Sequence, residues 1–149
     1  MGSAEKILIA SDHGGFRLKE NIKNYLKELG LGFEDFGCDS ETPVDYPELG
    51  KKVAVMVSGA DRKGILICGT GIGMSIAANR FKGVRAALCH NEITAKMSRE
   101  HNDSNILCMG GRILDTETAK RITKTWLETE FSQDARHKRR LEKIDEGAC

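Results

Sequence analysis

The stretch ILICGTGIGMS, residues 65–75, decides the fold of this 149-residue chain. An apolar run ends at Cys68, glycine occupies every second position up to Gly73, and an apolar segment follows. This pattern is typical of a buried strand that turns tightly into a helix, because glycine adopts backbone angles that other residues avoid. The stretch therefore predicts one strand–loop–helix unit of an α/β protein, with Cys68 at the mouth of the loop.

The same alternation continues on both sides of this unit. Apolar runs predict strands at residues 6–11, around 34, and ending at 68, 89 and 110. Helical spacing of apolar residues predicts helices over about 18–29, 47–58, from 73, 91–101, 115–129 and 132–146. Strands and helices that alternate in this way form a parallel sheet with helices on both faces. We therefore predict one domain over residues 1–149 with a Rossmann-like three-layer α/β/α fold.

Composition and charge narrow the possible partners. A formal net charge of +1 gives the molecule no general attraction to nucleic acid or to a membrane. The longest apolar-rich stretch, residues 65–78, is interrupted by three glycines and is too short to span a bilayer, and the N-terminal residues lack the apolar core of a signal peptide. We expect a cytoplasmic protein whose partners bind at local sites.

The five cysteines form neither a disulfide framework nor a zinc site. Their number is odd and no C-x-x-C pair occurs, which indicates a reducing compartment. Cys89 and Cys108, like Cys68, stand at or near the end of apolar runs, where cysteine is usually a small buried residue. Cys38 lies in a polar loop, where we expect an exposed thiol that oxidises and has no other role. Gly2 and Ser3 are typical of a cloning remnant.

The glycine loop favours an anion site, because its amides and the start of the following helix can face a negative charge. Met74 stands where the dinucleotide fingerprint needs its third glycine and where a phosphatase-type C-x5-R loop needs arginine. The G-K-[ST] of a P-loop is also absent. Its position alone does not decide the role of Cys68. The residue is either a buried strand residue or a thiolate that acts as nucleophile or base.

Ligands of doubly wound sheets bind outside the carboxyl ends of the strands. In this sequence the residues at those positions are Asp12, His13, residues 68–73, His90 and residues 110–112. Taken alone, Asp12 is also consistent with a helix cap and His13 with a solvated turn.

Two further groups carry useful chemistry. His101 and Asn102 end a predicted helix, and the dipole at a helix C-terminus favours a protonated histidine, which suits a general acid. Arg136 and Arg140 share one face of the last helix and could clamp a phosphate together with Arg112. Charge runs on helices are usually a solvated surface, and this run lacks the interleaved aromatic residues of nucleic-acid-binding segments.

Five stretches in order resemble the ribose-5-phosphate isomerase B family over nearly the whole chain: ASDHGGFRLKE, DYPELGKKVA, GILICGTGIGMSIAANRFKGVRAALC, SREHNDSNILCMGGR and RHKRRLEKI. The resemblance implies a Rossmann-like fold with strand order 2-1-3-4-5. It also implies a metal-free aldose–ketose isomerase, without a cofactor, that interconverts ribose 5-phosphate and ribulose 5-phosphate in the pentose phosphate pathway. Members of the family work as homodimers or pairs of dimers, with each active site at the subunit interface.

The resemblance also assigns roles to residues. Cys68 is similar to the family's proton-abstracting base, and His101 to its ring-opening acid, which we expect Asp12 to assist. Thr70 is suited to moving a proton between two substrate oxygens. The substrate-binding positions are Asp12, His13, Gly69, Thr70, Gly71, Ile72, Gly73 and Asn102. The phosphate-binding cations are Arg112, Arg136 and Arg140, of which the last two lie on the C-terminal helix at about 132–146.

Several alternatives stay open at this point. Some members of the family use a carboxylate in the loop region instead of the cysteine, but Ser75 stands at the end of the loop here, which favours a cysteine mechanism. The wider family includes allose-6-phosphate and galactose-6-phosphate isomerases. A phosphosugar-binding module without catalysis would make Cys68 dispensable, and a DNA-binding role for the last helix would show a steep salt dependence.

Overall fold

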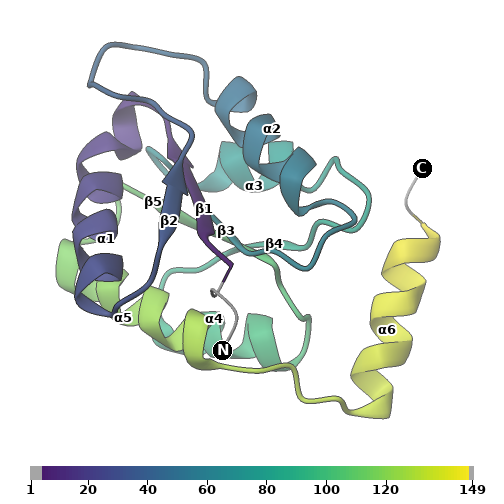
Figure 1. Cartoon of the computed structure of the whole chain (residues 1–149). Coiled ribbons are helices and arrows are strands. Elements are labelled where there is room, and N and C mark those ends of the chain that lie inside the picture. Colours follow the sequence, from purple (N-terminus) through teal and green to yellow (C-terminus); the bar gives the residue numbers. More distant parts are fainter. Residues whose placement is uncertain (1–4, 148–149) are drawn as a thin grey trace.

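Five parallel strands form the centre of the computed structural model, which describes residues 5–147 (Figure 1). Gly2, Ser3 and Cys149 lie outside the described residues. The strands are β1 (Ile7–Ser11), β2 (Phe33–Asp35), β3 (Gly64–Cys68), β4 (Ala86–Leu88) and β5 (Ile106–Gly110). They lie in the order β2-β1-β3-β5-β4. The chain therefore turns back between β1 and β3, so Asp12 and Cys68 lie at the switch point where ligands of such sheets bind.

The order of the last two strands differs from the predicted 2-1-3-4-5. β5 lies between β3 and β4, because Ile106 pairs with Gly64 on one side and with Ala86 on the other. All five residues of β5 are buried, whereas the three residues of β4 are only half-buried. A strand covered on both faces belongs in the centre of a parallel sheet, and a short, partly exposed strand belongs at an edge. The predicted parallel Rossmann-like sheet is confirmed, but the predicted order is wrong.

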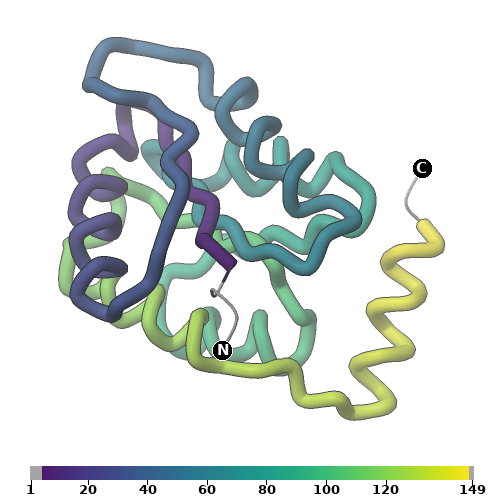
Figure 2. Tube along the Cα trace, in the orientation of Figure 1, coloured from purple at the N-terminus to yellow at the C-terminus, as the bar shows by residue number. Residues whose placement is uncertain are grey.

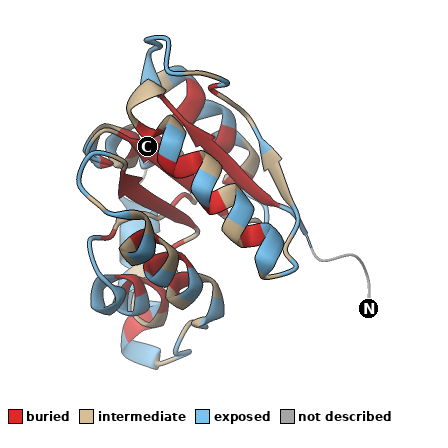
Figure 3. Cartoon of the chain, turned by 90° about the vertical axis from the view of Figure 1, so that its left-hand side faces the viewer, coloured by how far each residue is buried: buried red, intermediate tan, exposed pale blue. Residues whose placement is uncertain are grey.

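Helices cover both faces of the sheet, as predicted (Figure 3). One face packs against α1 (Phe16–Glu28), α4 (Glu92–Glu100) and α5 (Thr116–Glu128). The other face packs against α2 (Tyr46–Val57) and α3 (Ile72–Ala78). A short 3-10 helix, His13–Gly15, precedes α1. Successive residues of β1 alternate between the two cores, as the period of a strand requires.

The last helix, α6 (Ala135–Glu146), stands apart from these layers (Figures 1 and 2). Figure 2 shows the chain reaching α6 from α5 through a segment without helical turns. The helix begins at Ala135 and not at the predicted Ser132, because Asp134 caps it by accepting a hydrogen bond from the Arg136 amide. His137 is the one buried residue of α6.

Four cysteines of the described residues are buried, one of them against prediction. Cys89 and Cys108 are buried as predicted, and so is Cys68. The prediction of an exposed thiol at Cys38 is wrong, since this residue is also buried, packs with the core beside α2, and donates a hydrogen bond from its sulfur to the Ser40 carbonyl oxygen. Among residues 5–147, no helix has both the length and the apolar character needed to cross a membrane.

Candidate active site

Three loops meet at the carboxyl ends of β1, β3 and β5. Backbone hydrogen bonds join them: the Asp12 amide donates to the Ile67 carbonyl oxygen (3.2 Å), and the amides of Gly111 and Arg112 donate to the carbonyl oxygens of Cys68 (2.8 Å) and Gly69 (2.9 Å). These hydrogen bonds fix the positions of the three loops relative to one another.

Glycine is required where these loops touch. A Cβ on Gly111 would lie 2.5 Å from the Gly14 carbonyl oxygen, closer than any real contact. Gly71 has φ of +82°, a conformation that other residues rarely adopt, and a Cβ there would lie 2.6 Å from Leu88. The glycine pattern of the sequence thus serves both close packing and a left-handed turn.

Cys68 ends β3 and is 4% exposed. The Gly71 amide donates a hydrogen bond to its sulfur at 3.2 Å. This donor points at the atom that would carry the negative charge of a thiolate. The next amide, of Ile72, donates to the Thr70 hydroxyl (3.2 Å), so the loop itself uses two of its five amides.

Asp12 and His13 lie beside this loop, as predicted. One carboxylate oxygen of Asp12 accepts a hydrogen bond from the Gly15 amide at 3.1 Å, and the residue is buried, so its orientation is fixed. The His13 Nδ1 accepts a hydrogen bond from the Val44 amide (3.2 Å), which leaves Nε2 to carry the ring proton in the neutral form.

A cavity of about 240 Å³ opens next to these residues. Its lining consists of His13, Gly14, Arg17, Glu41, Gly111 and Arg112. Two arginines and a histidine line the cavity together with a single carboxylate. This excess of positive charge suits the binding of an anionic group. Arg17 and Glu41 form an ion pair across its mouth.

Tyr46 is a part of this region that the sequence analysis missed. It begins α2, and a Cβ on Gly73 would lie 2.4 Å from the tyrosine ring, so the ring covers the start of α3 directly. The side chain keeps 37% of its surface exposed. The available signal was its place directly before the helix predicted at 47–58, at the end of a loop, where binding residues often lie.

The second group of predicted residues lies at the opposite end of the strands, near the amino end of β5. His101 caps the C-terminus of α4, and Asn102 follows it, before β5 begins at Ile106. Cys68 pairs with Gly110, the other end of β5. The four residue steps from Ile106 to Gly110 span about 13 Å, so the structure does not bring His101 to Cys68 within one chain.

The start of α6 packs on this second group. The rings of His101 and His137 lie with centroids 4.4 Å apart, and the His137 Nδ1 is 2.7 Å from the Ser132 hydroxyl oxygen. The Ser132 amide in turn donates to the Glu100 carbonyl oxygen (3.1 Å). The sequence analysis missed His137, which lies inside the basic run.

Arg136 and Arg140 extend from the same part of α6 and are exposed. Arg136 donates to both carboxylate oxygens of Asp134, at 3.3 and 3.4 Å. This side-chain hydrogen bonding, with that of the Arg136 amide, lowers the pKa of Asp134 below its usual value. A phosphate that binds Arg136 would therefore compete with Asp134.

The predicted residues thus form two separate half-sites. The first, the cysteine half-site, contains Asp12, His13, residues 68–73 and Arg112. The second, the histidine half-site, contains His101, Asn102, Arg136 and Arg140. Among residues 5–147, no group of three or more His, Cys, Asp or Glu side chains is placed to hold a metal ion.

Comparison with known proteins identifies the family of the chain. Residues 7–144 match the family described as Ribose/Galactose Isomerase. The chain belongs to the ribose/galactose isomerase family. Ribose-5-phosphate isomerase B of Escherichia coli is 44% identical over 141 residues, which cover 94% of each chain. The structure of ribose-5-phosphate isomerase B from Clostridium thermocellum superposes with a TM-score of 0.92 at 50% identity, covering 95% of this chain and 96% of the other.

One further relative of this isomerase family bears on substrate size. The D-erythrulose-4-phosphate isomerase of Pectobacterium atrosepticum is 39% identical over 128 residues, covering 84% of each chain. The predicted family resemblance is confirmed, and the protein is an isomerase.

Proposed function

We propose that the protein interconverts ribose 5-phosphate and ribulose 5-phosphate at a site that two copies of the chain form together. The single observation that carries this proposal is that the cysteine half-site and the histidine half-site lie at opposite ends of the strands of one sheet. The chemistry needs both halves, because the sugar ring must be opened by an acid before a base can remove the C2 proton.

A groove on the chain supports a second copy as the completing partner. It has a volume of about 700 Å³ and runs between the β4 edge and α6, with Val84, Ala86, Asn102 and Ile144 in its lining. The exposed Ile72 and Ile76 lie on α3, next to the cysteine half-site. We propose that α3 of one copy docks into the groove of another, so that Cys68 lies beside the partner's Asn102 and both chains bury apolar surface.

The first step is ring opening. His101 of one copy protonates the ring oxygen of ribofuranose 5-phosphate, while Asp12 of the other accepts the proton of the anomeric hydroxyl. The C1–O4 bond breaks and the open aldehyde forms. The hydrogen bond from the Gly15 amide holds the Asp12 carboxylate in place for this role.

The second step is proton transfer. The Cys68 thiolate removes the C2 proton, and the electrons of that bond form an enediolate. Because the loop already uses the amides of Gly71 and Ile72, the enediolate oxygen has the amides of Gly69, Thr70 and Gly73 as donors. Thr70 moves a proton between the two oxygens, and Cys68 returns its proton to C1 to give ribulose 5-phosphate.

The phosphate is bound away from the reacting carbons. His13 and Arg112 line the cavity beside the cysteine half-site, and Arg136 and Arg140 of the partner approach it from α6. Binding energy gained at the phosphate positions C2 against Cys68 for a step several atoms away.

A coupled assay tests the activity with ribose 5-phosphate, allose 6-phosphate and galactose 6-phosphate, with and without EDTA. We expect turnover of ribose 5-phosphate that EDTA does not change. Preference for either six-carbon phosphate would replace the proposed substrate, and turnover of none of the three would end the proposal. Loss of activity in EDTA would refute the metal-free mechanism.

A mixing experiment tests the two-chain site. Cys68→Ser and His101→Asn homodimers are each expected to be inactive. After subunit exchange, each mixed dimer contains one site with both natural residues, so about a quarter of wild-type activity returns at equal mixing. No recovery, despite proven exchange, would place both residues in one chain's site and contradict the proposal.

A further inference from the structure

The turn that carries His101 and Asn102 has an unusual backbone at its next residue. Asp103 has φ of +44°, the left-handed region that non-glycine residues rarely adopt. Aspartate tolerates this region better than most residues, but the conformation persists only where surrounding groups hold it. The surroundings of Asp103 therefore decide the direction in which the preceding histidine leaves α4.

Two arginines from different elements hold Asp103. The Arg99 Nη1 donates to one carboxylate oxygen at 2.8 Å, and the Arg85 Nη2 donates to the other at 3.3 Å. The Arg85 Nε also donates to the Asp103 carbonyl oxygen at 2.9 Å. Side chain and backbone of Asp103 are thus both fixed.

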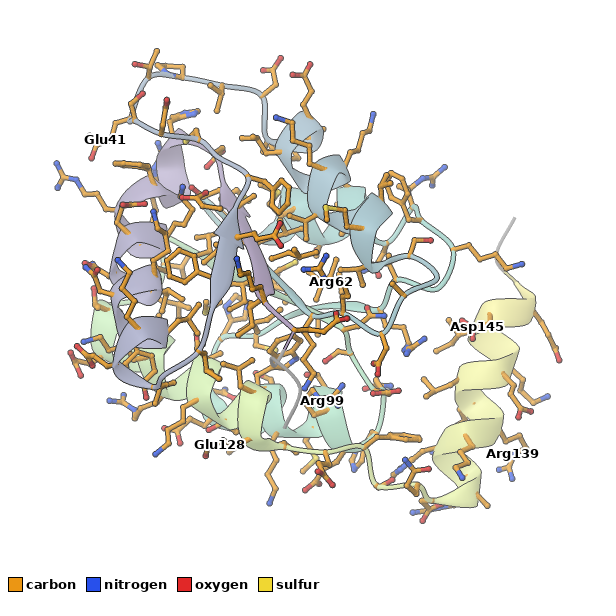
Figure 4. The ribbon with its side chains drawn as sticks, in the orientation of Figure 1. Glu41, Arg62, Arg99, Glu128, Arg139 and Asp145 are labelled. Carbon is orange, nitrogen blue, oxygen red and sulfur yellow. The ribbon has the colours of Figure 1, made fainter. Side chains whose placement is uncertain are left out.

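The two arginines are themselves anchored. Arg99 is 6% exposed, and it also donates to the carbonyl oxygens of Thr129 (3.0 Å) and Ser104 (2.5 Å); Figure 4 shows it within the body of the molecule. The Arg85 amide donates to the Asn105 side chain at 2.7 Å. Asp103 is therefore clamped by groups that the sheet edge and two helices hold in place.

Within the clamp, the Asp103 carboxylate faces the guanidinium groups of Arg85 and Arg99. Burial, and then the charge of Arg99, lower the pKa of Lys63 below its usual value, while the Asp103 charge opposes this shift. Removing the Asp103 carboxylate would leave two guanidinium groups close together with less compensation, so the turn would relax.

We propose that Asp103, clamped by Arg85 and Arg99, is a positioning residue that fixes the turn carrying the ring-opening acid His101. This inference rests on the proposed function. Asp103 does not touch the substrate; it acts through the place that it gives to His101. Its loss should therefore impair ring opening more than the proton transfer at Cys68.

Three measurements separate these steps. Ribose 5-phosphate is mostly a closed furanose, whereas an aldotetrose 4-phosphate cannot close a ring, because its only suitable hydroxyl carries the phosphate. Exchange of the C1 proton of ribulose 5-phosphate with solvent in D₂O also needs no ring opening. The first substrate reports on His101, and the other two measurements report on Cys68.

The test compares Asp103→Asn and Asp103→Gly, both of which tolerate a left-handed backbone. For Asp103→Gly we expect kcat on ribose 5-phosphate to fall by about 100-fold, the effect of a displacement of about 1 Å in a catalytic group. Turnover of the aldotetrose phosphate and C1 exchange should stay within about threefold of wild type. Asp103→Asn keeps one acceptor for the arginines and should retain more activity than the glycine variant.

The control is Glu117→Gln, which removes an exposed carboxylate that pairs with Lys120 on α5. It should leave all three rates unchanged. Thermal unfolding and sedimentation show whether the variants stay folded and keep their assembly. Equal losses on all three measurements, or no loss on ribose 5-phosphate, would overturn the inference. A wild type that does not turn over ribose 5-phosphate would instead refute the proposed function.

Discussion

Cys68 differs from the other buried thiols in the direction of its hydrogen bond. Its sulfur accepts from the Gly71 amide, whereas the sulfurs of Cys38 and Cys89 donate to oxygen atoms. Burial raises the pKa of the Cys89 thiol and raises that of Cys108 strongly. These two cysteines therefore stay neutral at physiological pH, in keeping with a packing role.

Replacing Cys68 tests its role as the base. For Cys68→Ser we expect kcat on ribose 5-phosphate to fall by about 10³-fold, since a positioned general base contributes on the order of 10²–10⁴. Cys89→Ala is the matched control, which should keep its turnover but lose about 1 kcal/mol of unfolding free energy, measured by denaturant titration. Near-full turnover by Cys68→Ser would show that another group is the base.

Asp35 gives the stability a pH dependence. Burial alone would raise its pKa, but hydrogen bonds from Lys19, Lys23 and the Gly37 amide outweigh burial and lower it. Because the folded pKa lies below the unfolded value, the stabilisation is complete above the unfolded pKa and is lost as the pH falls through the folded pKa.

We therefore expect Asp35→Asn to unfold more easily than wild type at pH 7. The cost should be about 3 kcal/mol, because the substitution removes the nearer carboxylate of the fully buried Lys19 ammonium and leaves only Glu20, at 3.6 Å. The gap should begin to shrink near the unfolded pKa, at about pH 4, and should close once the pH has fallen below the lower folded pKa, where the wild-type carboxylate is protonated. Urea titrations across this pH range measure the difference, and a constant gap at all pH values would contradict the assignment.

At the scale of elements, α6 has a clear signal that the sequence analysis used only in part. His137, Leu141 and Ile144 recur at helical spacing and form one side of a helix otherwise rich in charge. The basic run was interpreted by its arginines alone, so His137 and its stacking on His101 were missed.

Arg136 and Arg140 should contribute to binding more than to the chemical step. Arg136→Ala or Arg140→Ala is expected to raise KM for ribose 5-phosphate by about tenfold or more, the worth of a charge-assisted hydrogen bond, with a small change in kcat. Lys138→Ala, on the opposite side of α6, is the control and should match wild type. A loss confined to kcat would contradict phosphate binding at these arginines.

The order of β4 and β5 could not be predicted from local pattern. The sequences around both strands are apolar and end in cysteine or glycine, so each is consistent with a buried strand. Only pairing across the sheet shows that β4 has three half-buried residues and lies at the edge. Strand order depends on contacts between distant segments, which periodicity does not record.

The separation of His101 from Cys68 could have been predicted from the sequence. The rule that ligands bind outside the carboxyl ends of strands selected Asp12 and Cys68, and both lie at that end of the sheet. Applied to His101, the same rule places this residue at the amino end of the sheet, because it lies after a helix and before the next strand. The residues proposed for the site were named from the sequence, whereas the groove and the stacking of His137 on His101 required the structure.

At the scale of the whole molecule, the proposed site makes activity depend on assembly. We expect specific activity to fall when the protein is diluted below the dissociation constant of the proposed dimer, because in the proposed site each chain supplies only half of the groups. Activity and sedimentation measured over the same concentration range should fall together. Full activity of a proven monomer would contradict the two-chain site.

The distance of one strand length between Cys68 and His101 has a thermodynamic consequence. A sugar phosphate that touches both half-sites joins two chains, so it binds the dimer more tightly than either chain alone. By reciprocal linkage, the substrate must then strengthen the association of the chains by the same factor by which association strengthens substrate binding. At low protein concentration, the supply of substrate would itself set how much complete enzyme exists.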